Sequence, residues 1–408
     1  MTVTIAKHHA TMRGAFVLFE GLLPTVIDSQ VLTHVRLMRE ILGIDLTVVA
    51  FACTADVFVQ SEAAHERARQ TAGGDVHLFR GIRPALPGSL VINRRRLGQA
   101  LDAVGAVSFL HARGDYAAAV TGPLAQSRDL PMLWDCRGDS RAELRERIGA
   151  TSPLRRLPLA VRACMSERDS KRAGRTCSGA SFVSQALREL MAGYIGSKPS
   201  WVLPCLADEK AFFFDATLRQ RMRAQLGLDE GEPVYAYSGS LASYQRFDEV
   251  VDTFEATLRH QPLARLLILT PYADAARKKL AKFASDRVIC KAVGYAEVNG
   301  YLNAADFGFL LRDNTPVNHV AFPTKFAEYA MAGLPVIMKQ SPPSCVSEAQ
   351  ALGNFLPLSE VSRASAPRPA QRAAIANKAQ GQMGRRASIQ RFSDIYQALA
   401  ALAPPSGR

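Results

Sequence analysis

The sequence has no closely spaced cysteine pair and no long uninterrupted apolar run. Its seven cysteines are odd in number and widely scattered, and none forms a C-x-x-C pair, so we expect neither a disulfide framework nor a zinc site. The longest apolar runs, such as LTVVAFAC at 46–53, fall short of the roughly 18 residues that a membrane helix needs. The first residues lack the apolar core of a secretion signal. We therefore expect a cytoplasmic protein that is soluble or, at most, peripheral on the inner face of the plasma membrane.

Aromatic residues are missing from the most basic part of the chain. The formal net charge is +13, and residues 141–175 hold ten basic against four acidic residues without any Phe, Tyr or Trp. A positive field of this size favours an anionic partner, but single-stranded nucleic acids usually require aromatic stacking platforms as well, so we expect no nucleic-acid partner. Apolar residues alternate with arginines at 154–162, which is typical of a segment lying on an anionic membrane surface. An ordinary solvated basic face is the alternative.

Short apolar runs alternate with helical periods along most of the chain, as in α/β proteins with parallel sheets. The strongest strand patterns lie at 15–20, 44–52, 107–112, 131–136, 234–238, 265–270, 306–312 and 335–338, and the strongest helical patterns at 89–104, 185–196, 247–258 and 389–402. We predict two Rossmann-like, doubly wound domains that face each other across a cleft, because ligands of such sheets bind at the carboxyl ends of the strands. The expected parts are an N-terminal domain (1–206), a polar linker (207–232), a C-terminal domain (233–385) and a final helix and tail (386–408).

One apolar run, HVAFPTKFAEYAMAGLPVIM at 319–338, contains two opposite charges. Thr324 is a good N-cap residue, and a helix beginning there would direct free backbone amides and its positive dipole end toward an anion. Lys325, in the first turn, opposes that dipole unless an anion such as a diphosphate is shared between them. Glu328 lies one turn further on the same face, where its carboxylate could accept hydrogen bonds from ribose hydroxyls. A Lys–Glu pair on a surface helix is the alternative.

A glycine turn follows the expected strand at 234–238. The segment SGSL contains Gly239, where a sugar phosphate could approach the backbone closely. A Gly-Ser pair after a strand is a weak signal by itself.

The combination of these motifs resembles the GT-B glycosyltransferases, specifically glycosyltransferase family 4 in its bacterial surface-polysaccharide branch. PTKFAEYAMAGLPVI resembles the nucleotide-binding signature, and YSGSLASYQRFDEVVDTF and YLNAADFGFLLRD resemble the segments before it. FVSQALRELM, WVLPCLADEKAFF, HARGDYAAAV and LWDCRG resemble the acceptor domain. The resemblance spans nearly the whole chain and is far more specific in the second half.

The resemblance implies a nucleotide-diphosphate-sugar donor held by the second half. It implies that Glu328 binds the donor ribose, that Lys325 and Arg246 balance the charge of the departing diphosphate, and that Gly239, Ser240 and Thr324 lie at the donor. Ser240 replaces the arginine that is usual in the family, and Arg312, at the end of an expected strand, is a candidate to compensate for it. Val320 stands where the family carries a first glutamate. No acidic residue occurs from 314 to 327, so Asn318 and His319 become candidates for sugar contacts.

The first half carries polar residues at the ends of two expected strands: His111, Arg113, Asp135 and Arg137. Carboxyl strand ends are where ligands bind in open sheets, so we predict acceptor or cleft contacts for Arg113, Asp135 and Arg137 and a catalytic role for His111. A structural Asp135–Arg137 pair and a satisfied core histidine are the alternatives.

These residues lead to the hypothesis of a glycosyltransferase. As implied by the resemblance, it would transfer a sugar with retention, without metal or cofactor, to a lipid-linked or growing cell-surface glycan. Two alternatives stay open: a nucleotide-sugar 2-epimerase of GT-B fold, and a non-catalytic GT-B protein that binds an assembly partner.

Overall fold

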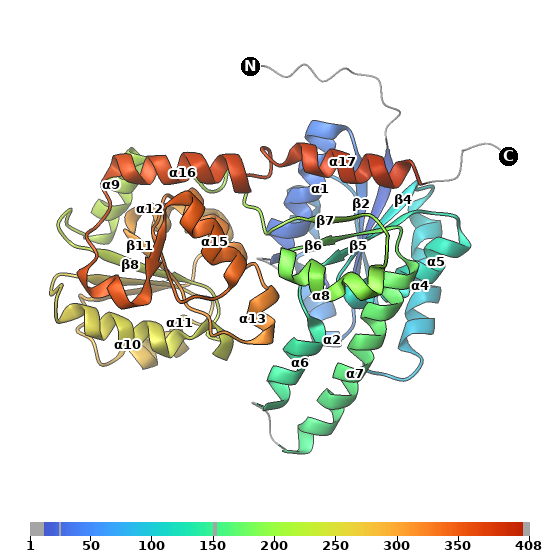
Figure 1. Ribbon diagram of the computed structural model, residues 1–408, viewed down its shortest axis with the longest axis horizontal. Helices are drawn as coiled ribbons and strands as arrows, with labels where there is room; N and C mark the ends of the chain where they lie inside the picture. Colours follow the sequence, from blue (N-terminus) through green and yellow to red (C-terminus); the bar gives the residue numbers. More distant parts are fainter. Residues whose placement is uncertain (1–11, 24–25, 150–152, 403–408) are drawn as a thin grey trace. The chain divides into compact units, whose positions relative to one another are not determined.

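The computed structural model describes residues 12–23, 26–149 and 153–402 (Figure 1). The chain divides into two compact units, one formed by Met1–Leu203 with Ile389–Arg408 and the other by Pro204–Ser388. Each unit is built on one parallel sheet covered by helices. The predicted pair of doubly wound α/β units is therefore confirmed.

The first unit contains a seven-stranded sheet in the order β3-β2-β1-β4-β5-β6-β7. All pairings in this sheet are parallel. Its strands are β1 (Arg13–Leu18), β2 (Asp45–Ala52), β3 (Val76–Arg80), β4 (Phe109–Arg113), β5 (Met132–Cys136), β6 (Gly179–Phe182) and β7 (Ser200–Val202). Its helices are α1 (Thr33–Leu37), α2 (Ala55–Ala63), α3 (His65–Ala72), α4 (Ser89–Val104), α5 (Asp115–Ser127), α6 (Ser140–Gly149), α7 (Pro153–Thr176), α8 (Gln185–Ile195) and α17 (Ile389–Ala400).

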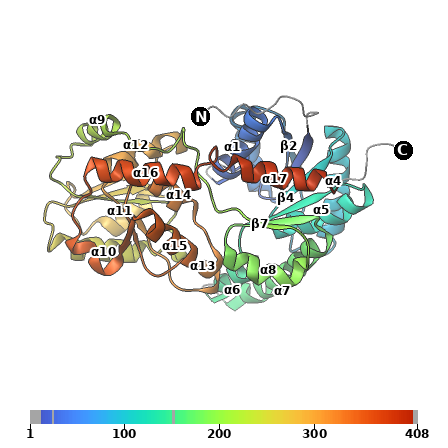
Figure 2. The ribbon, with the colours of Figure 1, turned by 45° about the horizontal axis from the view of Figure 1, so that its top comes forward.

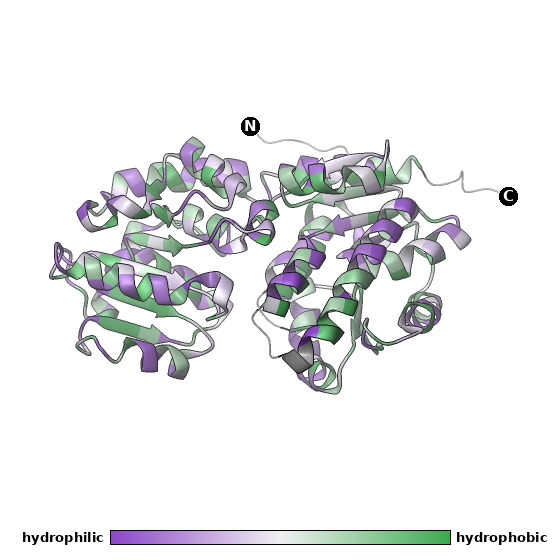
Figure 3. Cartoon of the chain, turned by 60° about the horizontal axis from the view of Figure 1, so that its bottom comes forward, coloured by the Kyte–Doolittle hydropathy of each residue, from purple (hydrophilic) through white to green (hydrophobic). Residues whose placement is uncertain are grey.

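The second unit contains a six-stranded parallel sheet in the order β10-β9-β8-β11-β12-β13. Its strands are β8 (Val234–Ser238), β9 (Arg265–Leu269), β10 (Val288–Lys291), β11 (Phe307–Leu310), β12 (Val336–Met338) and β13 (Phe355–Pro357). Its helices are α9 (Ala216–Leu226), α10 (Phe247–Leu258), α11 (Ala273–Leu280), α12 (Val298–Ala304), α13 (Pro316–Val320), α14 (Thr324–Met331), α15 (Pro343–Leu352) and α16 (Pro369–Met383). The central strands are strongly apolar (Figure 3), as expected when both faces of a sheet are covered.

Both sheets reverse their strand order between two central strands. The reversal lies between β1 and β4 in the first sheet and between β8 and β11 in the second. Ligands of open parallel sheets bind outside the carboxyl ends of the strands at such a point. In the second unit these ends lead into Gly239 and Arg312, and in the first unit β4 ends at Arg113. The topology therefore places Gly239, Arg312 and Arg113, which were predicted as site residues, at the carboxyl ends of the strands.

The segment expected to be a linker, 207–232, is folded into the second unit. It carries α9, whose Arg219 and Arg223 are buried and bind the carboxylate of Asp306 at 2.7 and 3.4 Å. Arg372 of α16 reaches the same region and donates to four backbone carbonyl oxygens. The polar composition that predicted a linker reflects buried arginines that neutralise the carboxyl end of α12 and Asp306.

The C-terminal helix α17 belongs to the first unit. Its apolar face buries Phe392, Ile395, Tyr396 and Leu399, as the spacing of these residues predicted. The Tyr396 ring lies 5.1 Å from the ring of Phe109 on β4, and Figures 1 and 2 show α17 lying across this sheet. The sequence reasoning did not assign α2, α3, α6 or α7 as helices, nor β3 as a strand. In α7, Pro153 occupies the first helical position, where its missing N–H costs little.

Candidate active site

The helix α14 begins one residue earlier than expected. Pro323 is the N-cap residue with extended backbone (φ −62°, ψ 130°), and Thr324 is the first helical residue. No side chain caps the helix. The predicted capping role of Thr324 is therefore wrong, because a hydroxyl inside the first turn is past the N-cap position from which it could accept the N3 amide. Without a side-chain cap, the N-terminus of α14 keeps the anion-binding character that was predicted for it.

Lys325 projects from the first turn of α14 into the glycine turn after β8. Its buried Nζ donates to Oε1 of Gln245 at 2.7 Å and lies 4.7 Å from the centre of the Tyr237 ring. Burial lowers the pKa of Lys325 well below its usual value, and the nearby charge of Arg312 adds to this effect. The charged form of the side chain is therefore disfavoured in the free protein, and an incoming anion would stabilise it.

The glycine turn is shaped to admit this lysine. Gly239 has φ +140°, a conformation that residues with a β-carbon rarely adopt. A β-carbon at this position would lie 2.9 Å from the Nζ of Lys325. The turn is held in place because the amide of Ser238 donates to the Tyr329 hydroxyl at 2.8 Å and the Tyr237 hydroxyl donates to the carbonyl of Ser240. Two residues of α14, Lys325 and Tyr329, thus contact the turn directly.

Glu328 lies on the same helix, and its side chain is buried. Burial raises the pKa of Glu328 to about 7, and the charge of Lys325 opposes this effect only partly. Within the described part of the chain, the carboxylate has no hydrogen bond and no ion pair within 4.0 Å. The alternative of a Lys–Glu pair on a surface helix is excluded, because both side chains are buried and they form no ion pair. An unpartnered buried carboxylate is costly, and such groups are candidates for ligand contacts.

Two arginines predicted for this site differ in their surroundings. Arg312 is buried, donates to the carbonyl of Tyr244 at 3.0 Å and lies 4.6 Å from the centre of the Tyr244 ring. Arg312 is therefore not a solvent-exposed surface arginine. Arg246 is 43% exposed in its side chain, has φ +53° and contacts Glu249 at 3.1 Å and Asp313 at 3.2 Å. Its charge is already partly neutralised by these carboxylates.

Sequence reasoning missed Lys339 at this edge of the sheet. Lys339 follows β12 directly, and its Nζ contacts Glu249 at 2.7 Å and Asp313 at 2.8 Å. It therefore shares both carboxylates with Arg246. A lysine at the carboxyl end of a strand was the available signal, since such ends form the ligand-binding edge.

Position 320 is where the family that the sequence resembles carries a glutamate. Here it is occupied by Val320, which lies buried at the end of α13. Asn318 is also buried, and its amide group donates to the carbonyl of Asp313 at 3.0 Å. The Asn318 amide thus stabilises the loop after β11, which reduces its availability for a sugar.

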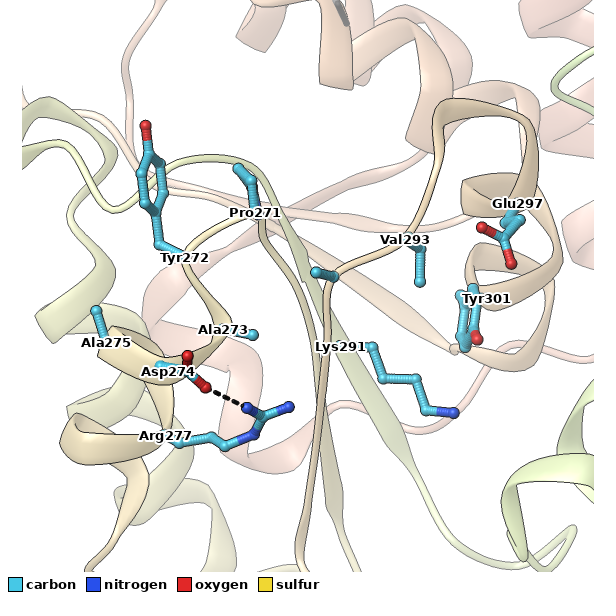
Figure 4. A pocket seen from close by; sticks show the side chains of 11 residues that line it. Pro271, Tyr272, Ala273, Asp274, Ala275, Arg277, Lys291, Val293, Glu297 and Tyr301 are labelled. Carbon is cyan, nitrogen blue, oxygen red and sulfur yellow. Dashed lines mark hydrogen bonds and ion pairs between the residues drawn. The ribbon is translucent and has the colours of Figure 1, made fainter.

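A pocket of about 840 Å³ opens at the ends of β9 and β10 (Figure 4). It lies on the same carboxyl edge of the sheet as the glycine turn, because Gly239 donates its amide to the carbonyl of Leu269 at the end of β9. Its lining combines two tyrosines with charged side chains, namely Tyr272, Tyr301, Asp274, Arg277, Lys291 and Glu297. It is thus more charged than the lining of a typical small-molecule site.

In the first unit, the other three predicted site residues surround Asp135. Its carboxylate lies 3.7 Å from Nε2 of His111, 3.8 Å from Arg113 and 3.4 Å from Arg137. Burial by itself would raise the pKa of Asp135, but Arg137, His111 and Arg113 together hold it well below its usual range. The predicted quartet is therefore one buried cluster around an ionised carboxylate.

Three members of this cluster were missed from the sequence. Ser181 donates to Asp135 at 3.0 Å. The hydroxyl of Tyr396 lies 2.9 Å from Nδ1 of His111 and 2.8 Å from Nε2 of His34. No local motif predicts these contacts, because β6, α1 and α17 come from distant parts of the chain.

Among the described residues, no group of three or more His, Cys, Asp and Glu side chains could hold a metal ion. No helix in the described ranges is both long and apolar enough to cross a bilayer.

Comparisons with known proteins identify the fold. No family model and no curated protein sequence matches the chain. Among solved structures, sucrose-phosphate synthase from Thermosynechococcus elongatus is similar with a TM-score of 0.65 at 16% identity, covering 96% of this chain and 99% of that one. Anabaena Alr3699/HepE in complex with UDP-glucose has a TM-score of 0.68 at 14% identity, covering 95% and 100%. UDP-N-acetylglucosamine 2-epimerase from Rickettsia bellii has a TM-score of 0.56 at 9% identity, covering 97% and 99%. With its two doubly wound parallel-sheet units, the chain has the GT-B fold.

Proposed function

We propose that this protein is a glycosyltransferase that uses a nucleotide-diphosphate sugar as donor. The observation that carries the proposal is the buried Lys325 ammonium inside the Gly239 turn. A buried cation without a carboxylate partner, beside an uncapped helix N-terminus, is suited to the oxygens of a diphosphate. The similarity to structures solved with UDP and UDP-glucose supports a nucleotide sugar as the ligand.

In the proposed reaction, the second unit stabilises the leaving group. Lys325, the first turn of α14 and Arg312 would balance the charge that develops on the diphosphate as the bond to the sugar breaks. The family that the sequence resembles usually carries an arginine at the position of Ser240. Lys325 would supply the charge of that arginine, because its Nζ reaches the glycine turn. Arg246 would contribute only after it leaves Glu249 and Asp313.

The nucleoside would be held beside the diphosphate. Glu328 would accept hydrogen bonds from the ribose hydroxyls, which would supply the partners that its buried carboxylate lacks. The pocket at the ends of β9 and β10 would accept the base, with Tyr272 and Tyr301 as aromatic surfaces. As in the family 4 enzymes that the sequence resembles, we propose that transfer retains the anomeric configuration and needs no metal or cofactor.

The acceptor is proposed to be a lipid-linked intermediate or a growing cell-surface glycan. Arg113, Asp135 and Arg137 form the polar cluster at the carboxyl ends of β4 and β5, where an acceptor would bind in this fold class. Asp135 would keep the two arginines in place.

We also propose that the first unit rests on an anionic membrane surface on the cytoplasmic side. Exposed large apolar side chains lie on α7, on α4 and on the loop before it, namely Leu86, Val91, Ile92, Leu157 and Val161. Both helices pack against α5, since Asn93 of α4 bonds to its Tyr116 and Arg162 of α7 lies over the same ring. The apolar stripe of α7 continues into exposed basic residues: Arg168, Lys171, Arg172 and Arg175. Apolar and basic groups on one face are typical of interfacial helices.

Calorimetric titration with UDP, GDP and ADP species, with and without sugars, tests the donor assignment. Binding of at least one of them is expected, and binding of none would refute the enzyme. With the donor known, product analysis with candidate acceptors tests transfer. Lys325→Ala and Glu328→Ala should abolish transfer while the fold is retained by circular dichroism, and Lys279→Ala, on the surface of the same unit, serves as the control.

A nucleotide-sugar 2-epimerase is the second candidate, favoured by the similarity to the Rickettsia bellii epimerase. An epimerase would convert the free nucleotide sugar in the absence of any acceptor, whereas a transferase would not. If the protein bound none of the nucleotides, the remaining alternative would be a non-catalytic GT-B protein that binds an assembly partner.

A further inference from the structure

The C-terminal helix closes a buried chain of polar side chains in the first unit. The Tyr396 hydroxyl of α17 lies 2.9 Å from Nδ1 of His111 and 2.8 Å from Nε2 of His34. On its other side, Nε2 of His111 lies 3.7 Å from Asp135. All four side chains are at most 7% exposed. Residues from β4, β5, α1 and α17 thus form one continuous network.

With neutral imidazoles, one arrangement of protons suits every member of this network. The ionised Asp135 carboxylate lies 3.7 Å from Nε2 of His111, which is beyond hydrogen-bond distance but close enough to favour an N–H over a lone pair at this nitrogen. In a neutral imidazole the other nitrogen, Nδ1, is then an acceptor, and the Tyr396 hydroxyl must donate to it. The Tyr396 oxygen in turn accepts from the Nε2–H of His34. In this arrangement, the electrostatic attraction of Asp135 for the Nε2–H of His111 favours one direction for the two hydrogen bonds that join His111, Tyr396 and His34.

We propose that Tyr396 is a positioning residue, which holds the His111 ring with its Nε2–H toward Asp135 and thereby fixes the carboxylate that orients Arg113 and Arg137. The proposal places the C-terminal helix among the elements that shape the acceptor side. It also replaces the catalytic role that was predicted for His111 with a supporting one. Both ring nitrogens are directed at protein groups, so His111 supports Asp135 instead of acting on a substrate.

The hydroxyl of Tyr396 can be separated from the packing of its ring. The ring contacts Phe109 with centres 5.1 Å apart, and Tyr396→Phe keeps this contact. The substitution removes only the donor to Nδ1 of His111. A matched control is Tyr116→Phe, since Tyr116 is buried in the same unit and its hydroxyl bonds to Asn93 at 2.7 Å, outside the network.

The experiment is nitrogen NMR of the full chain labelled at its eight histidines, with the His111 signals assigned from the His111→Gln variant. The wild type should show the Nε2–H tautomer of His111 with a hydrogen-bonded Nδ1. Tyr396→Phe should move the Nδ1 shift toward that of a free acceptor, and Tyr116→Phe should leave it unchanged. Asp135→Asn should allow both tautomers. An Nδ1–H tautomer in the wild type, or an unchanged Nδ1 shift in Tyr396→Phe, would overturn the proposal.

A kinetic measurement tests the consequence for transfer, and this part rests on the proposed function. Tyr396→Phe should lower kcat by about tenfold through misplacement of the acceptor contacts while the nucleotide Kd stays at the wild-type value. An unchanged kcat would refute the positioning role. If the wild type bound no nucleotide, the proposed function would fail while the NMR result still decided the network.

Discussion

Lys325 and Gly239 are adapted to each other although 86 positions separate them. The Nζ of Lys325 lies 2.9 Å from the point where a β-carbon of Gly239 would stand, and Gly239 has φ +140°. The glycine therefore provides both the backbone conformation and the space that the lysine occupies. This contact joins the turn after β8 to the first turn of α14, and the proposed diphosphate site depends on it.

Removing the charge of Lys325 should weaken nucleotide binding. Lys325→Met keeps the length of the side chain but loses charge-assisted hydrogen bonds of about 1.5–3 kcal/mol, which corresponds to about a 10- to 100-fold higher Kd. Because burial lowers the pKa of Lys325, the wild type should also take up protons on binding, measurable as a buffer-dependent enthalpy in calorimetry. Lys279→Met, on exposed α11, is the control. An affinity within about twofold of the wild type would contradict the assignment.

Adding a methyl group to Gly239 should displace the lysine. Gly239→Ala would force the Nζ of Lys325 to move and would strain the backbone, with an expected loss of about 1–3 kcal/mol of stability. Nucleotide affinity should fall together with it. Gly231→Ala, in the same unit, meets no atom within 4 Å and should change neither quantity in denaturation and calorimetry. If Gly239→Ala bound nucleotide normally, Lys325 would not depend on the turn.

Glu328 should make stability depend on pH. Its pKa is raised to about 7 in the folded protein against about 4.3 when unfolded, so the folded state binds the proton more tightly and stability falls as pH rises through this window. Glu328→Gln should thus be more stable than the wild type above pH 7, by at most about 4 kcal/mol, and equal to it near pH 4. Denaturant unfolding of the second unit at pH 4, 6 and 8 measures this. A difference independent of pH would contradict the burial argument.

Arg372 should contribute strongly to the stability of the second unit. It is fully buried and donates to the carbonyl oxygens of Leu302, Asn303, Ala305 and Ala332. Arg372→Met would remove a buried donor from all four acceptors, of which Asn303 and Ala305 keep Arg219 as a donor, at a cost of about 3–5 kcal/mol. Lys378→Met, exposed on the same helix, should cost less than about 0.5 kcal/mol. Denaturant unfolding that resolves the two units separates these outcomes, and equal effects would refute the role of Arg372.

The apolar end of α7 should contribute to membrane binding. Leu157 and Val161 are 74% and 50% exposed, so their replacement by Asp should leave the fold intact while it removes apolar area and adds negative charge. Sedimentation with phosphatidylglycerol vesicles should show that the wild type binds. The double variant Leu157→Asp with Val161→Asp should bind these vesicles at least about tenfold more weakly. The wild type should bind little to phosphatidylcholine vesicles. Leu263→Asp, 55% exposed in the second unit, is the control. Equal binding of all variants would refute the surface.

Local patterns in the sequence determined the sheets and the principal helices. Alternation of short apolar runs with helical periods predicted the parallel α/β units, and α4 and α10 have the predicted bounds of 89–104 and 247–258. The spacing of Phe392, Ile395, Tyr396 and Leu399 predicted the buried face of α17. These predictions succeed because periodicity and burial act over a few neighbouring residues.

The tertiary structure decided which charges are buried and what they contact. Polar composition at 207–232 suggested a linker, but Arg219 and Arg223 are held by Asp306 more than 80 positions away. The network from Asp135 to His34 depends on Tyr396, 285 positions from His111. The sequence by itself could place Lys325 and Glu328 on one helix. Only the fold could show that Lys325 enters the Gly239 turn and that Glu328 lacks a partner, because burial and electrostatic environment depend on residues that chain folding brings together from distant positions.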